Sequence, residues 1–214
     1  MTLELQAVAV TPKGGVALFP AISLAVQPGQ VATVMGPSGI GKSTLLDAIA
    51  GHLSHGFTLS GRIRLDGIDI TPLPPEARRV GLMFQDAVLF PHLSVGDNLA
   101  FGLVRRIRGW ADRRAAVEAA LSRAGLCGLY DRDPATLSGG QRSRAALMRT
   151  LLAEPRALLL DEPFSKLDAT LRDDLRTFTF DHIRNRAIPA LMVTHDPADA
   201  KAADGPVIDL TTDG

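Results

Sequence analysis

Short apolar runs alternate with segments of helical periodicity along most of the chain. Five runs of four or five mostly apolar residues lack regular polar alternation, and such runs are typical of strands buried on both faces of a parallel sheet. They cover residues 31–35, 80–84, 157–161, 190–194 and 207–210. Helix-type segments separate them, so the pattern predicts an α/β fold whose largely parallel sheet has helices on both faces.

Strand-type segments near the N-terminus predict a second, smaller β layer. Residues 3–10, 22–26 and 62–65 carry strand sequences, with glycine-containing turns at 13–15 and 28–29 between them. We expect these strands to pair antiparallel beside the parallel sheet.

A helical stretch interrupts the alternation after the run at 80–84. Within it, residues 110–124 are rich in Arg and Ala, and apolar residues return at helical spacing, which predicts an amphipathic helix.

We expect one domain over residues 1–214. In it, residues 1–86 and 154–214 form a catalytic core, and residues 87–153 form an inserted helical subdomain.

A glycine-rich loop follows the first apolar run. Residues 36–44 match the pattern G-x-x-x-x-G-K-[ST] between a strand and a helix start. Such a loop turns backbone N–H groups towards nucleotide phosphates, and the helix N-terminus adds partial positive charge. Lys42 is expected to reach the terminal phosphates, and the Ser43 hydroxyl to bind Mg²⁺. The predicted nucleotide-binding residues are Gly36, Pro37, Ser38, Gly39, Gly41, Lys42, Ser43 and Thr44.

Two acids, Asp161 and Glu162, end the run at 157–161. In open α/β sheets, ligands bind at the carboxyl ends of the strands. We therefore expect Asp161 to bind Mg²⁺, directly or through water, and Glu162 to orient and deprotonate an attacking water. The alternative, two acids that cap a strand in solvent, is the weaker interpretation beside a phosphate loop.

The segment Leu-Ser-Gly-Gly-Gln at residues 137–141 precedes a helix-type segment and forms a second anion-binding helix start. The phosphate loop, this segment and the strand acids occur in one order, and in this the chain resembles the ATP-binding subunits of ATP-binding cassette (ABC) transporters over essentially its whole length. On this resemblance, Gln85 is identified as the glutamine of the family's Q-loop, residues 165–168 as its D-loop and His195 as its switch histidine.

The resemblance implies how the two glycine-rich sites meet. Two subunits pack head to tail as a homodimer, and each ATP lies between the phosphate loop of one subunit and the signature motif of the other. The residues implied on the signature side are Ser138, Gly139, Gly140 and Gln141, with Asp168 helping to build the interface.

The resemblance also assigns catalytic roles beside Lys42 and Glu162. It implies that Gln85 binds Mg²⁺ and water, and that His195 holds the γ-phosphate and the attacking water in line. Each of these residues also has an ordinary interpretation: Ser138 and Asp168 as helix N-caps, His195 as a capping residue and Gln85 as a polar strand end.

Residues 90–99 are similar to the segment after the Q-loop in bacterial importer ATPases. The resemblance then implies two integral membrane permease subunits and a substrate-binding protein as partners. The apolar segment Leu89, Phe90 and Pro91 is expected to receive a short permease helix. The chain ends soon after its last predicted strand, so we expect a short form without the C-terminal regulatory domain of many importers, similar to the thiamine-type ATPases.

Two positions depart from the family pattern. The aromatic residue that stacks on adenine is replaced by Lys13, and the next aromatic residue along the chain is Phe19. Phe19 could substitute, or the stem of Lys13 could lie across the base. Lys166 stands where the D-loop usually has a small residue. It could pair across the interface between subunits or be solvated, and we expect solvation.

Composition limits the function further. The chain has 46% hydrophobic residues, a mean hydropathy of +0.13 and 23 residues of each charge, which fits a globular protein and argues against nucleic-acid binding. No apolar run reaches the length of a membrane span and no signal peptide is recognised, so we expect a peripheral position on the cytoplasmic face of the inner membrane.

Cys127 is expected to act as a small hydrophobe. The five arginines between residues 105 and 114 are expected to be solvated or to face a partner or lipid head groups.

Other classes of ATPase share some of these motifs. A DNA-repair or chromosome-organising ATPase would carry a long coiled coil between the loop and the signature, and a translation-factor ATPase would carry two cassettes. A small-molecule kinase would use the loop without the signature. We therefore expect a Mg²⁺-dependent ATPase that powers transport, with a non-transport ABC ATPase as the alternative.

Overall fold

The computed structural model describes residues 1–211 of the 214-residue chain. They form two compact units. The core unit comprises Met1–Leu82, Arg156–Glu162 and Phe180–Gly214, and the helical unit comprises Met83–Pro155 and Pro163–Thr179. This grouping differs from the sequence-based boundaries, because residues 83–86, residues 154–155 and Pro163–Thr179 belong to the helical unit rather than to the core.

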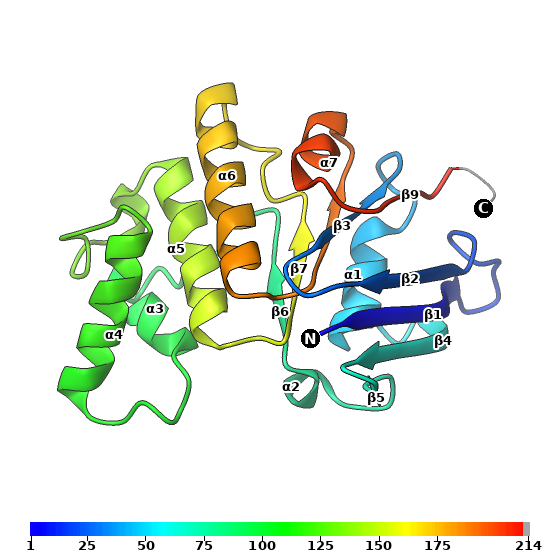
Figure 1. The fold of residues 1–214 in the computed structure, drawn as a ribbon, viewed down its shortest axis with the longest axis horizontal. Coiled ribbons are helices and arrows are strands. Elements are labelled where there is room, and N and C mark those ends of the chain that lie inside the picture. Colours follow the sequence, from blue (N-terminus) through cyan, green and yellow to red (C-terminus); the bar gives the residue numbers. More distant parts are fainter. Residues whose placement is uncertain (212–214) are drawn as a thin grey trace. The chain divides into compact units, whose positions relative to one another are not determined.

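A five-stranded parallel sheet is the base of the core unit, in the order β6-β7-β8-β3-β9 (Figure 1). The strands are β3 Val31–Met35, β6 Val80–Met83, β7 Ala157–Asp161, β8 Ala190–Thr194 and β9 Val207–Asp209. β3, β7 and β8 are buried along nearly their whole length, which is why their sequences are almost uniformly apolar. The expected α/β fold with its parallel sheet is confirmed.

The register of the three central strands brings their C-terminal ends to one edge of the sheet. Met35 of β3 pairs with Thr194 of β8, and Asp161 of β7 pairs with Val193 of β8. The three strands therefore end within one residue of each other. The residues that follow them are Gly36, Glu162 and His195.

A second sheet of four antiparallel strands has the order β2-β1-β4-β5. The strands are β1 Leu3–Pro12, β2 Ile22–Val26, β4 Phe57–Leu65 and β5 Ile68–Asp69. β4 begins earlier than predicted because its first residues pair with the end of β1, Phe57 with Pro12, on a largely solvent-facing stretch without an apolar run. β5 escaped prediction because it has only two residues.

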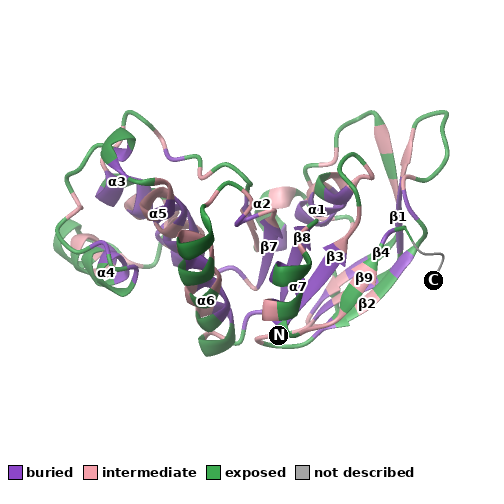
Figure 2. Ribbon diagram, turned by 90° about the horizontal axis from the view of Figure 1, so that it is seen from above, coloured by how far each residue is buried: buried purple, intermediate pink, exposed green. Residues whose placement is uncertain are grey.

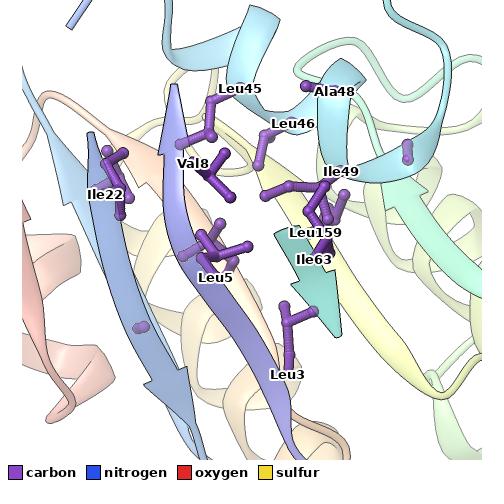
Figure 3. Close-up of a cluster of buried hydrophobic side chains, with 14 of the residues drawn as sticks. Leu3, Leu5, Val8, Ile22, Leu45, Leu46, Ala48, Ile49, Ile63 and Leu159 are labelled. Atoms are coloured by element: carbon purple, nitrogen blue, oxygen red, sulfur yellow. The ribbon is translucent and has the colours of Figure 1, made fainter. Parts of the chain in front are cut away.

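Helix α1 (Lys42–Ala50) packs against both sheets, and most of its residues are buried. Figure 3 shows its side chains Leu45, Leu46, Ala48 and Ile49 among Leu3, Leu5, Val8, Ile22 and Ile63 of the antiparallel sheet and Leu159 of β7. Helix α7 (Pro197–Ala203) lies on the opposite face of the parallel sheet from α1 (Figure 2). The short helix α2 (Pro75–Arg78) precedes β6. Because α1 starts at Lys42, its burial between the sheets fixes the end of the phosphate loop.

The helical unit contains the helices α3 (Val95–Gly102), α4 (Trp110–Arg123) and α5 (Gly139–Leu152). A 3₁₀ turn at Pro134–Thr136 leads to α5, and α6 (Ala169–Asn185) begins in this unit. α3 and α5 approach closely at Gly102, where a Cβ atom would lie 2.2 Å from the carbonyl oxygen of Arg149, so the packing requires glycine there. None of the described helices is long and apolar enough to cross a bilayer.

Candidate functional site

Lys42 lies inside the phosphate loop. Its ammonium group donates hydrogen bonds to the carbonyl oxygens of Gly36 at 2.7 Å and Pro37 at 3.0 Å. The side chain is only 5% exposed, and the burial of this charge is balanced by these carbonyls. Ser38 and Gly39 at the top of the loop are exposed. The loop thus holds one buried cation beneath an open rim.

The start of α1 has the features of an anion-binding helix end. Its N-cap, Gly41, has φ 106°, a left-handed conformation that favours glycine, and no side chain caps the first turn. A Cβ atom on Gly41 would lie 2.9 Å from Leu18, so the loop is packed tightly against the end of the turn after β1. Uncapped N–H groups and the helix dipole together favour a phosphate at this position.

Asp161 and Ser43 meet at the carboxyl end of β7. The Ser43 hydroxyl donates to Oδ1 of Asp161 at 3.1 Å. Burial raises the pKa of the Asp161 carboxyl above its usual value, the charges of Glu162 and Asp47 raise it further, and Ser43 and Lys42 oppose the rise. A hydroxyl and a carboxylate at one point are ligands that Mg²⁺ accepts when nucleotide phosphates supply the rest. The two residues therefore fit the metal role expected of them.

Glu162 stands between Lys42 and His195. Its Oε1 lies 3.2 Å from Nδ1 of His195 and 3.9 Å from Nζ of Lys42. Its backbone has φ 42°, a conformation uncommon for a residue other than glycine and frequent at functional sites. The side chain is 16% exposed and that of His195 is 55% exposed. A carboxylate in this position can take a proton from water that reaches it from the open side.

His195 is not a helix cap. The N-cap of α7 is Asp196, whose carboxylate accepts from the N–H of Ala198 at 2.8 Å. The ordinary interpretation weighed for His195 is therefore wrong, and its imidazole faces Glu162 instead.

The signature motif lies in the helical unit, where Ser138 is the N-cap of α5. Its Oγ accepts from the N–H of Gln141 at 3.2 Å, and Oε1 of Gln141 accepts from the N–H of Ser138 at 2.9 Å, which together form a capping box. Leu167 and Leu171 lie beside Gly139 and Gly140, so a Cβ atom on Gly140 would meet Leu171 at 3.2 Å. The capping role is present, and it leaves the exposed Ser138 hydroxyl able to donate outward.

Gln85 and the D-loop contact each other within the helical unit. Nε2 of Gln85 donates to Oγ of Ser165 at 3.1 Å. Lys166, which is 53% exposed, forms an ion pair with Asp86 of its own chain, a contact that neither interpretation of Lys166 anticipated. Asp168 caps α6 by accepting from the N–H of Leu171 at 3.0 Å. Its role in an interface between subunits stays a prediction.

Phe19, the first aromatic residue after Lys13, is not available for base stacking. Phe19 is 3% exposed and belongs to the core beneath Gly41, so the alternative in which Phe19 stacks on a base is wrong. Lys13 is exposed in the turn after β1, and Val16 in the same turn is 84% exposed. Any base at this turn therefore meets an aliphatic or basic side chain.

An apolar patch on the helical unit comprises Val88, Phe90 and Phe101. The Phe90 and Phe101 rings meet edge to face with centroids 4.8 Å apart, and Val88 and Phe101 are 57% and 70% exposed. Arg149 of α5 donates to the carbonyl oxygen of Val88 at 2.8 Å and lies over the Phe90 ring. Leu89, which the sequence grouped with this surface, is buried.

A buried asparagine fixes the backbone of the patch. The Asn98 side chain is fully buried, accepts from the N–H of Phe90 at 2.7 Å and donates to the carbonyl oxygens of Phe90 and Ser94 at 3.1 and 2.9 Å. Because both the donor and the acceptor of the amide are used, the segment before α3 is held in one conformation.

Two sequence expectations outside the site change with the structure. Cys127 is exposed rather than a buried small hydrophobe. Three of the five arginines between 105 and 114 are engaged inside the helical unit. Arg106 pairs with Glu154, Arg113 donates to the carbonyl oxygens of Ala100 and Ile107, and Arg114 pairs with Glu118 and Asp131.

The core unit therefore brings together Lys42, Ser43, Asp161, Glu162 and His195. The helical unit brings Gln85 to the D-loop and the D-loop to the signature glycines. Sequence reasoning missed Asp86 and Arg149. The pairing of Asp86 could have been suspected from its negative charge next to Gln85 and from the unusual positive charge of Lys166 in the D-loop.

The raised pKa of Asp161 has a consequence for stability. A folded-state pKa above the unfolded value means that ionisation of Asp161 destabilises the fold as the pH rises above about 4. In EDTA, Asp161→Asn should raise the melting temperature by about 1–3 °C at pH 7.5, and the gain should shrink as the pH falls towards 4. The control is Asp204→Asn, at an exposed position. A lower melting temperature for Asp161→Asn at pH 7.5 would show that attraction to Lys42 outweighs burial.

Comparison with known proteins agrees with this geometry. The sequence pattern of the family described as "ABC transporter" matches residues 19–165. The chain is 50% identical over 189 residues to the uncharacterised ABC transporter ATP-binding protein YnjD of Escherichia coli K12, covering 88% of this chain and 86% of that protein. It is 47% identical to the thiamine import ATP-binding protein ThiQ of Cereibacter sphaeroides, covering 81% and 74%.

Longer relatives and a solved structure also match. The chain is 43% identical to the Fe(3+) ions import ATP-binding protein FbpC of Rhizobium etli, with 91% of this chain covered, and spans about half (54%) of that protein. A dimeric structure of the ATP-binding cassette MJ0796, in a post-hydrolysis state bound to ADP and Pi, matches with a TM-score of 0.81 and 28% identity, covering 97% of this chain and 94% of that one. The chain therefore belongs to the ABC transporter family, as an ATP-binding subunit.

Proposed function

We propose that this chain hydrolyses ATP to power the import of a substrate by a membrane transporter. The observation that carries the proposal is the position of the Glu162 carboxylate, 3.2 Å from His195 and 3.9 Å from the buried ammonium of Lys42. A base, a polar partner and a phosphate-binding cation at one sheet edge are the groups that phosphoryl transfer to water needs.

In this proposal each core residue has one task. The N–H groups at the start of α1 and the Lys42 ammonium bind the terminal phosphates of ATP. Glu162 accepts a proton from the attacking water, and His195 holds Glu162 and donates to the γ-phosphate. Because Glu162 is held by its backbone conformation and by both neighbours, its carboxylate is oriented before substrate arrives.

The proposed metal is Mg²⁺, and the residues assigned to it are Ser43, Asp161 and, from the resemblance, Gln85. When bound, Mg²⁺ neutralises charge that develops on the phosphate oxygens. The oxygen-only ligand set is the kind that Mg²⁺ prefers. Burial raises the pKa of the Asp161 carboxyl, so a bound cation would stabilise its ionised form.

We further propose that two copies bind ATP between them, with the phosphate loop of one facing Ser138 of the other. Capping and phosphate binding are compatible at Ser138, since its Oγ accepts from Gln141 while the hydroxyl hydrogen stays available as a donor. The dimeric ATP-binding cassette MJ0796 supports this arrangement.

The proposed partners are two permease subunits in the membrane and a substrate-binding protein, without nucleic acid. Relatives named for thiamine and Fe(3+) import support the direction of transport. The apolar patch Val88, Phe90 and Phe101 is the proposed permease contact, because exposed apolar side chains on a fixed backbone mark binding surfaces. Such a subunit would lie on the cytoplasmic face of the inner membrane.

Loss of the base should separate binding from hydrolysis. Glu162→Gln should lower the ATPase rate at least about a hundredfold, the usual contribution of a general base, and should keep ATP affinity. Lys42→Ala should instead raise the Kd for ATP, measured by calorimetry. A Glu162→Gln variant that hydrolyses within tenfold of the wild type would contradict the assignment of the base.

The missing aromatic should weaken discrimination between bases. GTP should support turnover within about tenfold of ATP, because base stacking on an aromatic side chain is worth about 1–3 kcal/mol. Lys13→Tyr should lower the KM for ATP by restoring a stacking surface. A preference of the wild type for ATP above a hundredfold would show that another group recognises adenine.

The apolar patch should be needed for assembly and not for folding. Phe101→Asp, at a side chain that is 70% exposed, should keep the melting temperature and ATP binding but lose copurification with the permease and transport in cells. The matched control is Trp110→Asp, at an exposed aromatic residue (75%) outside the patch. Full transport by Phe101→Asp would place the permease contact elsewhere.

A further inference from the structure

Two adjacent residues after β6 pair with two adjacent residues after β7. Gln85 donates to Ser165 at 3.1 Å, and Asp86 forms an ion pair with Lys166. The partners are 80 positions apart in the sequence, and all four residues belong to the helical unit. The segment that carries the Q-loop glutamine is thus tied to the D-loop by two neighbouring contacts.

The two contacts reinforce each other. Lys166 and Asp86 are 53% and 68% exposed, so their ion pair alone is weak in water. Since consecutive residues on each segment share a backbone, one contact holds the partners of the other at a high effective concentration. Loss of the ion pair should therefore loosen the hydrogen bond between Gln85 and Ser165 as well.

The tied segments carry different functional surfaces. The chain after Asp86 leads into Val88 and Phe90 of the apolar patch. The chain after Lys166 leads to Leu167, which lies 3.7 Å from the position of a Cβ atom on Gly139. Along the chain, the paired residues thus directly precede residues of the patch and a residue that contacts the signature motif.

We propose that Lys166 is a positioning residue, which holds Gln85 on Ser165 through Asp86 and so links the segment 85–90 to the segment 165–168. This inference rests on the proposed function in one respect, the role of Gln85 as a Mg²⁺ ligand. Nε2 of Gln85 donates to Ser165, and Oε1 is the amide atom with metal-binding chemistry. Lys166 therefore sets the orientation in which Gln85 can act.

The first test needs no nucleotide or metal. Hydrogen exchange of the full chain in EDTA should show faster exchange of amides in both segments, 84–90 and 164–168, for Lys166→Ala and for Asp86→Ala. The exchanged pair Lys166→Asp with Asp86→Lys should return exchange towards the wild-type rate. The control is Arg106→Ala, which breaks another exposed ion pair of this unit, with Glu154, and should leave both segments unchanged.

The second test measures function. Lys166→Ala and Asp86→Ala should raise the Mg²⁺ concentration for half-maximal ATPase activity about two- to fivefold, the range for an exposed ion pair, and the exchanged pair should restore it. Arg106→Ala should have no effect on it.

The outcomes separate this inference from the proposed function. Unchanged exchange in both segments, or an exchanged pair that behaves like the single variants, would overturn the positioning role of Lys166. If Gln85→Ala shifts the Mg²⁺ dependence and Lys166→Ala does not, the inference fails and the proposed function stands. If Gln85→Ala itself leaves the Mg²⁺ dependence unchanged, the role proposed for Gln85 fails.

Discussion

The register of three buried strands is the constraint on which the site depends. β3, β7 and β8 pair in parallel and end within one residue of each other, so the residues that follow them meet at one sheet edge. Each strand is apolar because it is covered on both faces. A shift of any one strand by a single residue would turn its side chains to the other face. It would also separate Glu162 from Lys42 and His195. Burial of hydrocarbon thus sets the geometry of the charged groups.

The helical unit uses ordinary structural devices to present its functional groups. Ser138 and Asp168 are both helix N-caps, and the buried Asn98 holds the backbone of the apolar patch. Arg149, on the same helix as the signature motif, holds Val88 at the patch. Helix α5 thus carries the signature motif at its N-terminal end and contacts the patch through Arg149 near its C-terminal end. It connects the signature motif to the patch, in addition to the Lys166–Asp86 pair. The capping roles of Ser138 and Asp168 are therefore compatible with the roles proposed for these residues.

Much of this organisation could be predicted from the sequence, because it depends on local patterns. Uniform apolar runs gave the bounds of β3, β7 and β8. The residue types after two of these runs predicted Lys42, Ser43, Asp161 and Glu162, and the resemblance to the ABC family added His195. The errors concern contacts between distant segments. The pairing of Lys166 with Asp86, the burial of Phe19 and the exposure of Cys127 depend on which surfaces meet in the fold, and residue spacing carries no record of that. The first half of β4 was missed because a strand with solvent-facing residues has no apolar run.

The central claim is that the signature motif of one subunit completes the ATP site of another. Sedimentation of Glu162→Gln, alone and combined with Ser138→Arg, at a saturating ATP-Mg²⁺ concentration tests it most directly. The account predicts a dimer for Glu162→Gln and a monomer that still binds ATP when Ser138→Arg is added, because the added side chain blocks the partner's phosphates and leaves its own loop intact. Loss of ATP binding by that monomer, or a dimer that persists with the arginine in place, would contradict the claim.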